Sequence, residues 1–171
     1  MKSKTTQKLI PLVATLVSSA TSYAGDLTAT IEVPRLDVAE YHRPYIAAWV
    51  EAADRSIVAD LAVWYDVEMP NKEGETWLKD IRQWWRKSGR NKELPIDGIS
   101  GPTKPVGEHS LDAQLPKMNT GSYYFVVEAS REVGGRELIR IPFDWAENTT
   151  IKQSATGERE LGKITLNIQS K

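Results

Sequence analysis

The chain has 171 residues, a formal net charge of −1 at pH 7 and no cysteine. The absence of cysteine excludes thiol redox chemistry, thiolate metal sites and c-type haem attachment. The slightly acidic balance argues against nucleic acid as a partner, because phosphate binding needs a basic face.

The first 24 residues have the pattern of a secretory signal peptide. Three lysines among the first eight residues precede a short apolar stretch, Leu9–Val17. Ser22-Tyr23-Ala24 then places small side chains at the two positions that a signal peptidase inspects. We expect cleavage between Ala24 and Gly25. The apolar stretch is too short to span a bilayer, which takes roughly 20 apolar residues.

Removal of this signal leaves residues 25–171, which we expect to form a single domain. These 147 residues have a usual size for one domain with one core, and they carry a net charge of −4. None of their segments is apolar enough for a membrane helix, so we expect a periplasmic protein without membrane insertion of the mature chain. An exported domain without disulfides depends on its core, which its six Trp and five Tyr can supply.

The mature chain begins with a pattern typical of a β-strand. Leu27, Ala29, Ile31 and Val33 alternate with polar residues, and this period of two predicts a strand with one wet face. Six further strands are expected at residues 45–51, 57–66, 109–114, 121–131, 136–143 and 161–168.

One segment, residues 75–88, has helical periodicity instead. Trp77, Ile81, Trp84 and Ser88 recur at helical spacing, which predicts an α-helix. A loop rich in glycine, proline and charge follows, over residues 90–107.

The order of these elements indicates the fold class. Val133-Gly134-Gly135 lies between two of the expected strands and is a strong hairpin signal. About seven short antiparallel strands with one inserted helix predict a mainly β fold, an antiparallel β-sandwich that we expect to be immunoglobulin-like.

The loop after the helix contains Asp97-Gly98-Ile99-Ser100-Gly101-Pro102-Thr103. This segment resembles the motif at which exported flavoproteins carry FMN on a hydroxyl: Asp, two variable residues, Ser or Thr, Gly, Ala, then Thr or Ser. Asp97, Ser100 and Gly101 match, whereas Pro102 stands where the motif has Ala, and proline fixes the backbone there. The resemblance implies that an FAD:protein FMN transferase esterifies Thr103, with Asp97 as a recognition residue.

The residues themselves allow two interpretations of this loop. An acceptor for phosphoryl transfer needs an accessible hydroxyl on a flexible segment, and the glycines leave the backbone unobstructed. Asp, Gly, Ser and Pro are also the residues of ordinary turns.

Five further segments carry a second resemblance, which covers nearly the whole mature chain. Together they resemble an uncharacterised family of predicted bacterial periplasmic proteins. Members of that family resemble components encoded beside flavin transferases and PepSY-type membrane proteins, which implies exported electron transfer. The segments are Glu32-Val33-Pro34-Arg35, Tyr41-His42-Arg43-Pro44-Tyr45, Ala62-Val63-Trp64-Tyr65, Arg82-Gln83-Trp84-Trp85-Arg86 and Gly135-Arg136-Glu137-Leu138.

The helix supplies candidate cofactor contacts. Trp84, Trp85 and Trp77 offer flat faces for an isoalloxazine ring. The basic residues that could offset a phosphate are Arg82, Arg86, Lys87, Arg90 and Lys104. The alternative is structural: tryptophans at helical spacing are more often core, and basic residues are more often a solvated helix face.

A second candidate surface is Tyr41-His42-Arg43-Pro44-Tyr45. His42 and His109 are the only histidines, and their spacing does not indicate a metal site. The sequence also contains no Ser-His-Asp signature and no glycine-rich phosphate loop.

Two functions remain open at this point. The first is a periplasmic redox carrier with FMN on Thr103, with the transferase and a PepSY-type membrane protein as partners. The second is a non-enzymatic binding or accessory module for a membrane or periplasmic partner, since an immunoglobulin-like fold does not determine function.

Overall fold

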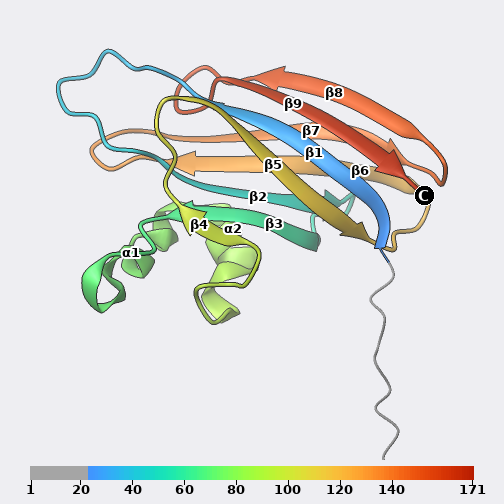
Figure 1. Cartoon of the computed structure of the whole chain (residues 1–171), viewed down its shortest axis with the longest axis horizontal. Helices are drawn as coiled ribbons and strands as arrows, with labels where there is room; N and C mark the ends of the chain where they lie inside the picture. The colour runs from blue at the N-terminus through green and yellow to red at the C-terminus, as the bar shows by residue number, and fades with distance from the viewer. Residues whose placement is uncertain (1–22) are drawn as a thin grey trace, which may run out of the picture.

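The fold is a sandwich of two β-sheets with a helical insert on the outer face of one sheet (Figure 1). A computed structural model describes residues 23–171. The four-stranded sheet has the order β5 (Gly107–Pro116), β1 (Tyr23–Val33), β9 (Lys163–Ser170) and β8 (Thr150–Thr156). The five-stranded sheet has the order β4 (Ser100–Pro102), β3 (Ile57–Tyr65), β2 (Tyr45–Ala52), β6 (Gly121–Ser130) and β7 (Arg136–Trp145).

The main core lies between the two sheets. Leu27, Ala29, Ile31 and Val33 of β1 are at most 1% exposed, as their alternation predicts. They pack with inward residues of the five-stranded sheet, and in β2 every second residue contributes to this core. Burial of this apolar surface is the dominant stabilising contribution of the sandwich.

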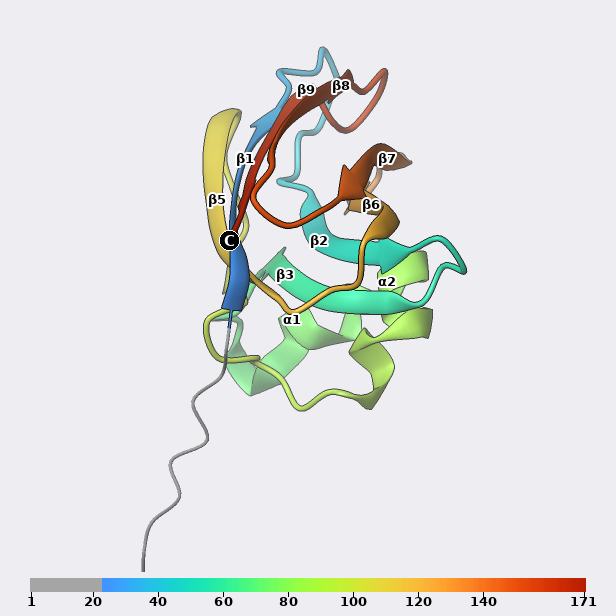
Figure 2. The same ribbon diagram turned by 90° about the vertical axis from the view of Figure 1, so that its right-hand side faces the viewer.

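A second core lies between the five-stranded sheet and the helical insert. The other set of β2 residues, Tyr45, Ala47 and Trp49, packs there against the insert. Strand β2 is therefore buried on both faces, which explains its continuous apolar sequence. Figure 2 shows the insert on the side of β2 and β3 that faces away from the four-stranded sheet.

The insert consists of short segments rather than the single helix that its periodicity predicts. Leu78, Ile81 and Trp84 are all buried, but the chain leaves the helical conformation at Ile81, with φ −79° and ψ 74°. A new helix then starts at Arg82. The segments are η1 (Pro70–Lys72), α1 (Glu73–Thr76), η2 (Leu78–Asp80), α2 (Arg82–Lys87) and η3 (Gly89–Asn91).

The physical reason for the break is a contact with the sheet. The buried carboxylate of Glu128 in β6 accepts the backbone N–H groups of Gln83 and Trp84, at 3.0 and 2.9 Å. These are the first donors of α2, which have no partner within the helix. Contacts with the sheet therefore determine where α2 begins, although the helical spacing of the apolar residues predicts one continuous helix.

The predicted sandwich is confirmed, and the hairpin at Val133-Gly134-Gly135 joins β6 and β7 as expected. The immunoglobulin-like strand order is not confirmed, because β1 and β2 belong to different sheets whereas the first two immunoglobulin strands share one. Two strands, β4 and β8, lie in segments where no strand is predicted. The predicted signal peptide lies outside the described residues except for Tyr23 and Ala24, which begin β1.

Candidate functional site

A pocket of about 770 Å³ lies at one end of the five-stranded sheet. Figure 1 shows this end, where the loop between β1 and β2 and the turn between β6 and β7 project beyond the strands. Four parts of the chain line the pocket: residues 41–45, several residues between Asp66 and Arg82, Thr103 and the turn at residues 130–136. We call it the arginine pocket, after Arg43, Arg82, Arg131 and Arg136 in its wall.

Strand register brings these distant segments together. Strands β2 and β6 are antiparallel, so the first residue of β2, Tyr45, pairs with the last residue of β6, Ser130. Strand β3 runs back to the same end, and β4 lies parallel to it. Pro102, the last residue of β4, pairs with Tyr65, the last residue of β3. The next residue, Thr103, therefore lies at that end too, and its backbone N–H donates to the Tyr65 carbonyl at 3.2 Å.

Thr103 lies in the wall of the pocket and is 8% exposed. Its hydroxyl donates to Asp66, with 3.1 Å between Oγ1 and Oδ1. The Tyr45 hydroxyl donates to the other oxygen of Asp66 at 3.3 Å. Burial raises the pKa of Tyr45, and the Asp66 charge raises it further. Tyr45 therefore stays protonated and acts as a hydrogen-bond donor.

The arginines of the pocket differ in their partners. Arg131 pairs with Glu160, at 2.8 Å, and Arg136 pairs with Glu128, at 2.6 Å. By contrast, no carboxylate among residues 23–171 lies within 4.0 Å of the guanidinium of Arg43 or of Arg82. The acidic residues of the wall are Asp66, Asp80 and Glu132. The two unpaired guanidinium groups favour an anionic ligand.

Two aromatic side chains form the exposed rim. Trp77 is 44% exposed and Tyr41 is 36% exposed. The Tyr41 ring lies over the guanidinium of Arg131, 5.9 Å from ring centroid to Cζ. Burial raises the pKa of Tyr41, although the Arg131 charge partly lowers it. Such rings can stack on a planar ligand.

The structure places the residues of the Asp97–Thr103 motif differently from the expected flexible loop. Ser100 and Gly101 belong to β4, and the Ser100 hydroxyl accepts the backbone N–H of Ile96 at 2.9 Å. Asp97 is exposed on the preceding turn. Within the motif, only Thr103 lines the pocket. The expectation of a loop is therefore wrong for Ser100–Pro102, which form β4 and pair with β3.

The three tryptophans of the insert lie in different environments and do not form one surface. Trp84 is fully buried, and its Nε1 donates to Asp60 at 2.9 Å, so its ring has no exposed face for a cofactor. Trp85 is partly buried against the second core. Trp77 is the member of the set that lines the pocket.

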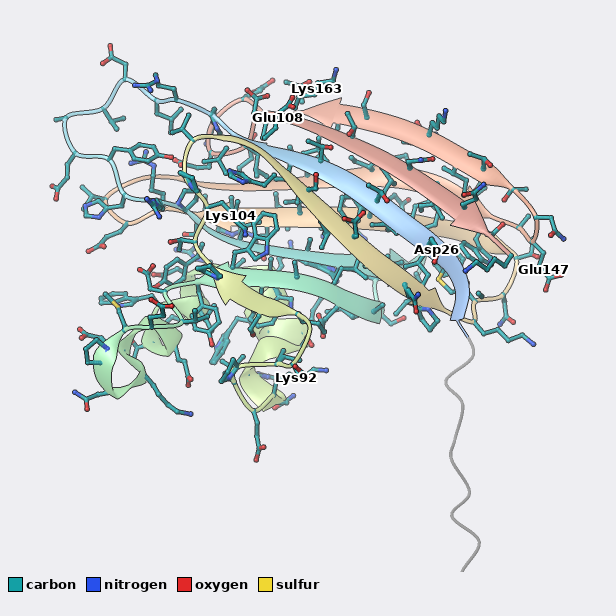
Figure 3. All side chains as sticks on the ribbon, in the orientation of Figure 1. Asp26, Lys92, Lys104, Glu108, Glu147 and Lys163 are labelled. Atoms are coloured by element: carbon teal, nitrogen blue, oxygen red, sulfur yellow. The ribbon has the colours of Figure 1, made fainter. Side chains whose placement is uncertain are left out.

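Among the basic residues considered for a phosphate, Arg82 lies in the wall and the others lie elsewhere. Lys87 forms an ion pair with the buried Glu51. Lys104, labelled in Figure 3, lies over the Trp64 ring at 5.0 Å. The other two, Arg86 and Arg90, are exposed.

The second candidate surface, Tyr41, His42, Arg43 and Tyr45, lines the same pocket as Thr103. His42 lies between two acidic side chains, with Nε2 3.0 Å from Glu40 and Nδ1 3.5 Å from Glu132. Over the part of the chain that the structure describes, no group of three His, Cys, Asp or Glu side chains is placed to hold a metal ion.

Sequence reasoning missed Asp66 and Arg131. Asp66 directly follows an apolar strand, and this position is only a weak indication of a functional residue. Arg131 offers a better one: it continues the alternation of Phe125, Val127 and Ala129, all of which are fully buried. An arginine in phase with an inward face requires a buried partner.

The chain matches the model of a known protein family. The model of the family described as "Predicted periplasmic protein (DUF2271)" matches residues 16–163. None of the curated proteins matches the chain. Among the described residues, no helix is long and apolar enough to cross a membrane.

Proposed function

Since the chain belongs to the DUF2271 family of predicted periplasmic proteins, we propose that it is an exported binding protein that holds a small anionic aromatic molecule in the arginine pocket. The convergence of unpaired arginines with exposed aromatic rings carries this proposal. Arg43 and Arg82 supply positive charge, and Trp77 and Tyr41 supply flat apolar faces. The volume of about 770 Å³ lies within the usual range of small-molecule sites.

FMN is the first candidate ligand, because it joins a flat ring system to a phosphate. The pocket has residues for both parts: Trp77 and Tyr41 for the ring, Arg43 and Arg82 for the phosphate. FMN would supply one- and two-electron transfer chemistry. The protein would bind and orient it.

Thr103 is the proposed attachment residue for covalently held FMN. Its place in the pocket wall supports this assignment, since a flavin attached there would remain beside the aromatic rim. Because the Thr103 hydroxyl is buried and bonded to Asp66, attachment requires that it first release Asp66 and become accessible to the transferase. The FAD:protein FMN transferase would break the pyrophosphate bond of FAD, join the FMN phosphate to Oγ1 and release AMP. The adjacent Asp66 carboxylate opposes a phosphate ester at this position, so Asp66 would have to move away from Thr103 in the modified protein.

The physiological role that follows is exported electron transfer. A PepSY-type membrane protein would deliver electrons, and the domain would pass them to an acceptor outside the cytoplasm. This assignment of partners rests on the resemblance described above.

The first test is the intact mass of the protein purified from a bacterial periplasm that contains the transferase. We expect the mass to rise by one FMN less water, on the peptide that contains Thr103, and Thr103→Ala to stay unmodified but folded. An unmodified wild type, with a known substrate modified in parallel, overturns covalent attachment. Native mass spectrometry of the same sample and titration with free FMN then test the binding function. If no small molecule is retained and FMN does not bind, the proposed function is wrong.

A second candidate function is an accessory module that docks on a protein partner through the same end of the sandwich. Trp77, Met69 and Tyr41 are exposed around the pocket, and Trp and Tyr are favoured at interface hot spots. A colourless protein that co-purifies with a membrane partner, and loses it in Trp77→Ala, favours this function.

A further inference from the structure

We propose that Arg131 is the residue that recognises the anionic group of the ligand, through its Nη1 atom. The Arg131 side chain is 5% exposed and lines the arginine pocket. Among the described side chains, its Nη1 is the one buried nitrogen or oxygen without a hydrogen-bond partner. Buried donors in folded proteins are almost always paired, so an unpaired guanidinium N–H in a pocket wall indicates a missing acceptor. The further claim that the ligand is aromatic rests on the proposed function.

The pairing of Arg131 with Glu160 leaves one edge of the guanidinium available. Nε donates to Oε2 of Glu160 at 2.8 Å, and Nη2 donates to Oε1 at 3.2 Å. A guanidinium has five N–H donors, and these two contacts use one edge. The remaining edge, which contains Nη1, can donate two parallel hydrogen bonds to an oxyanion.

The β6–β7 turn is shaped around this ion pair. A Cβ on Gly134 would lie 2.5 Å from Arg131 Cζ, and a Cβ on Gly135 would lie 2.8 Å from Glu160 Oε1. The Gly135 N–H also donates to Oε1, at 2.7 Å. The two glycines therefore admit the guanidinium and its partner against the backbone of the turn.

Glu160 is itself held in place by the neighbouring strand. Glu137 accepts the four backbone N–H groups of residues 158–161, at 2.7 to 3.1 Å. Because the loop that carries Glu160 is fixed in this way, the position of Arg131 is fixed as well. A preorganised guanidinium loses little conformational freedom when it binds an anion.

The position of Tyr41 suggests how the anion reaches Nη1. Its ring lies over the guanidinium and belongs to the loop between β1 and β2. The Nη1 atom itself is buried, so Tyr41 must shift before an oxyanion can contact Nη1, and its ring can then stack on the planar part of the ligand. Phosphate and carboxylate share this chemistry, and the experiments below separate them.

The first experiment compares FMN with riboflavin, which lacks the phosphate, by fluorescence titration of the purified protein. We expect the wild type to bind FMN about tenfold to a hundredfold more tightly, as a charge-assisted hydrogen bond implies. The double variant Arg131→Gln/Glu160→Gln removes both buried charges together and should reduce this preference at least tenfold, because only Arg43 and Arg82 then remain for the phosphate. Arg90→Gln, which changes an exposed arginine outside the pocket, should keep it. A folded double variant that retains the wild-type preference overturns the role of Arg131.

The second experiment uses the wild-type protein, so it tests the role of Arg131 even if the double variant does not fold. The side-chain NMR signal of Arg131 in the wild type is followed during addition of inorganic phosphate, acetate or FMN. A shift with phosphate indicates a phosphorylated ligand, and a shift with acetate alone indicates a carboxylate. FMN binding that leaves this signal unchanged overturns the inference but not the proposed function. A phosphate-induced shift without any flavin binding supports the inference and contradicts FMN as the ligand.

Discussion

Thr103 and Asp66 form a hydrogen bond that joins the ends of two parallel strands, with 3.1 Å between the Thr103 hydroxyl and the carboxylate. Thr103 follows β4, and Asp66 follows β3. Since β4 has only three residues, its pairing with β3 is short. The side-chain contact therefore helps to hold the end of β4 against the sheet.

We expect Thr103→Val to lower the free energy of unfolding by about 1 kcal/mol, because it removes the donor to Asp66 while keeping the shape of the side chain. Thr103→Ser keeps the hydroxyl and should be close to wild type. Urea denaturation followed by circular dichroism measures both. Equal stability of the valine variant and the wild type would mean that the hydrogen bond contributes nothing in solution.

Truncation of Trp84 should mainly lower stability, whereas truncation of Trp77 should mainly weaken ligand binding, because the two side chains lie in different environments. Trp84 is fully buried, so Trp84→Ala should cost about 3–5 kcal/mol of stability. Trp77 is 44% exposed, so Trp77→Ala should cost about 1 kcal/mol or less but weaken ligand binding. Thermal unfolding and ligand titration of the two variants separate these effects. Normal binding by Trp77→Ala would remove this ring from the site.

The sandwich is predictable from the sequence because its inward residues follow a simple period. In β1 the buried Leu27 and Ala29 alternate with the exposed Thr28, as the sequence pattern predicts. Strand β8 lacks that signal. It is an edge strand in which Ile151 and Ala155 are partly buried and the other residues are exposed, so no apolar alternation marks it.

The pocket could be predicted only in part, because contacts between distant residues create it. The sequence offers Thr103 and the Tyr41–Tyr45 segment separately, and the pairing of β2 with β6 and of β3 with β4 brings them together. Arg131 and Glu160 lie 29 residues apart, and no local pattern connects them. The glycines of the turn are explained as well by the hairpin as by the ion pair that they accommodate.

Glu128 fixes the helical insert on the sheet, so its removal should loosen the insert. Glu128→Gln keeps the size of the side chain but loses the charge that accepts two backbone N–H groups and pairs with Arg136. We expect a loss of about 3 kcal/mol, since buried donors lose a charged acceptor. Glu93→Gln, an exposed position in the loop that follows the insert, should have no effect. A stable Glu128→Gln protein would show that other contacts suffice to start α2.

Glu137 should make the stability of the protein depend on pH in the acidic range. Burial alone would raise the pKa of Glu137, but the backbone N–H groups of Glu158 and the three following residues outweigh it and hold the pKa below its usual value. A carboxyl group with a lowered folded-state pKa stabilises the protein fully above its unfolded pKa of about 4.3. This contribution is lost as the pH falls through the folded pKa.

The measurement is the free energy of unfolding of wild type and Glu137→Gln between neutral and acidic pH. The wild type should be more stable at neutral pH, and the difference should shrink as Glu137 becomes protonated, because both proteins then carry a neutral side chain there. Glu147→Gln changes an exposed carboxyl group and should follow the wild-type curve (Figure 3). A difference that stays constant with pH would mean that Glu137 acts through packing rather than through its charge. If the difference does shrink with pH, the loop that positions Glu160 and Arg131 is held by the charged form of Glu137, and anion binding should weaken over the same acidic range.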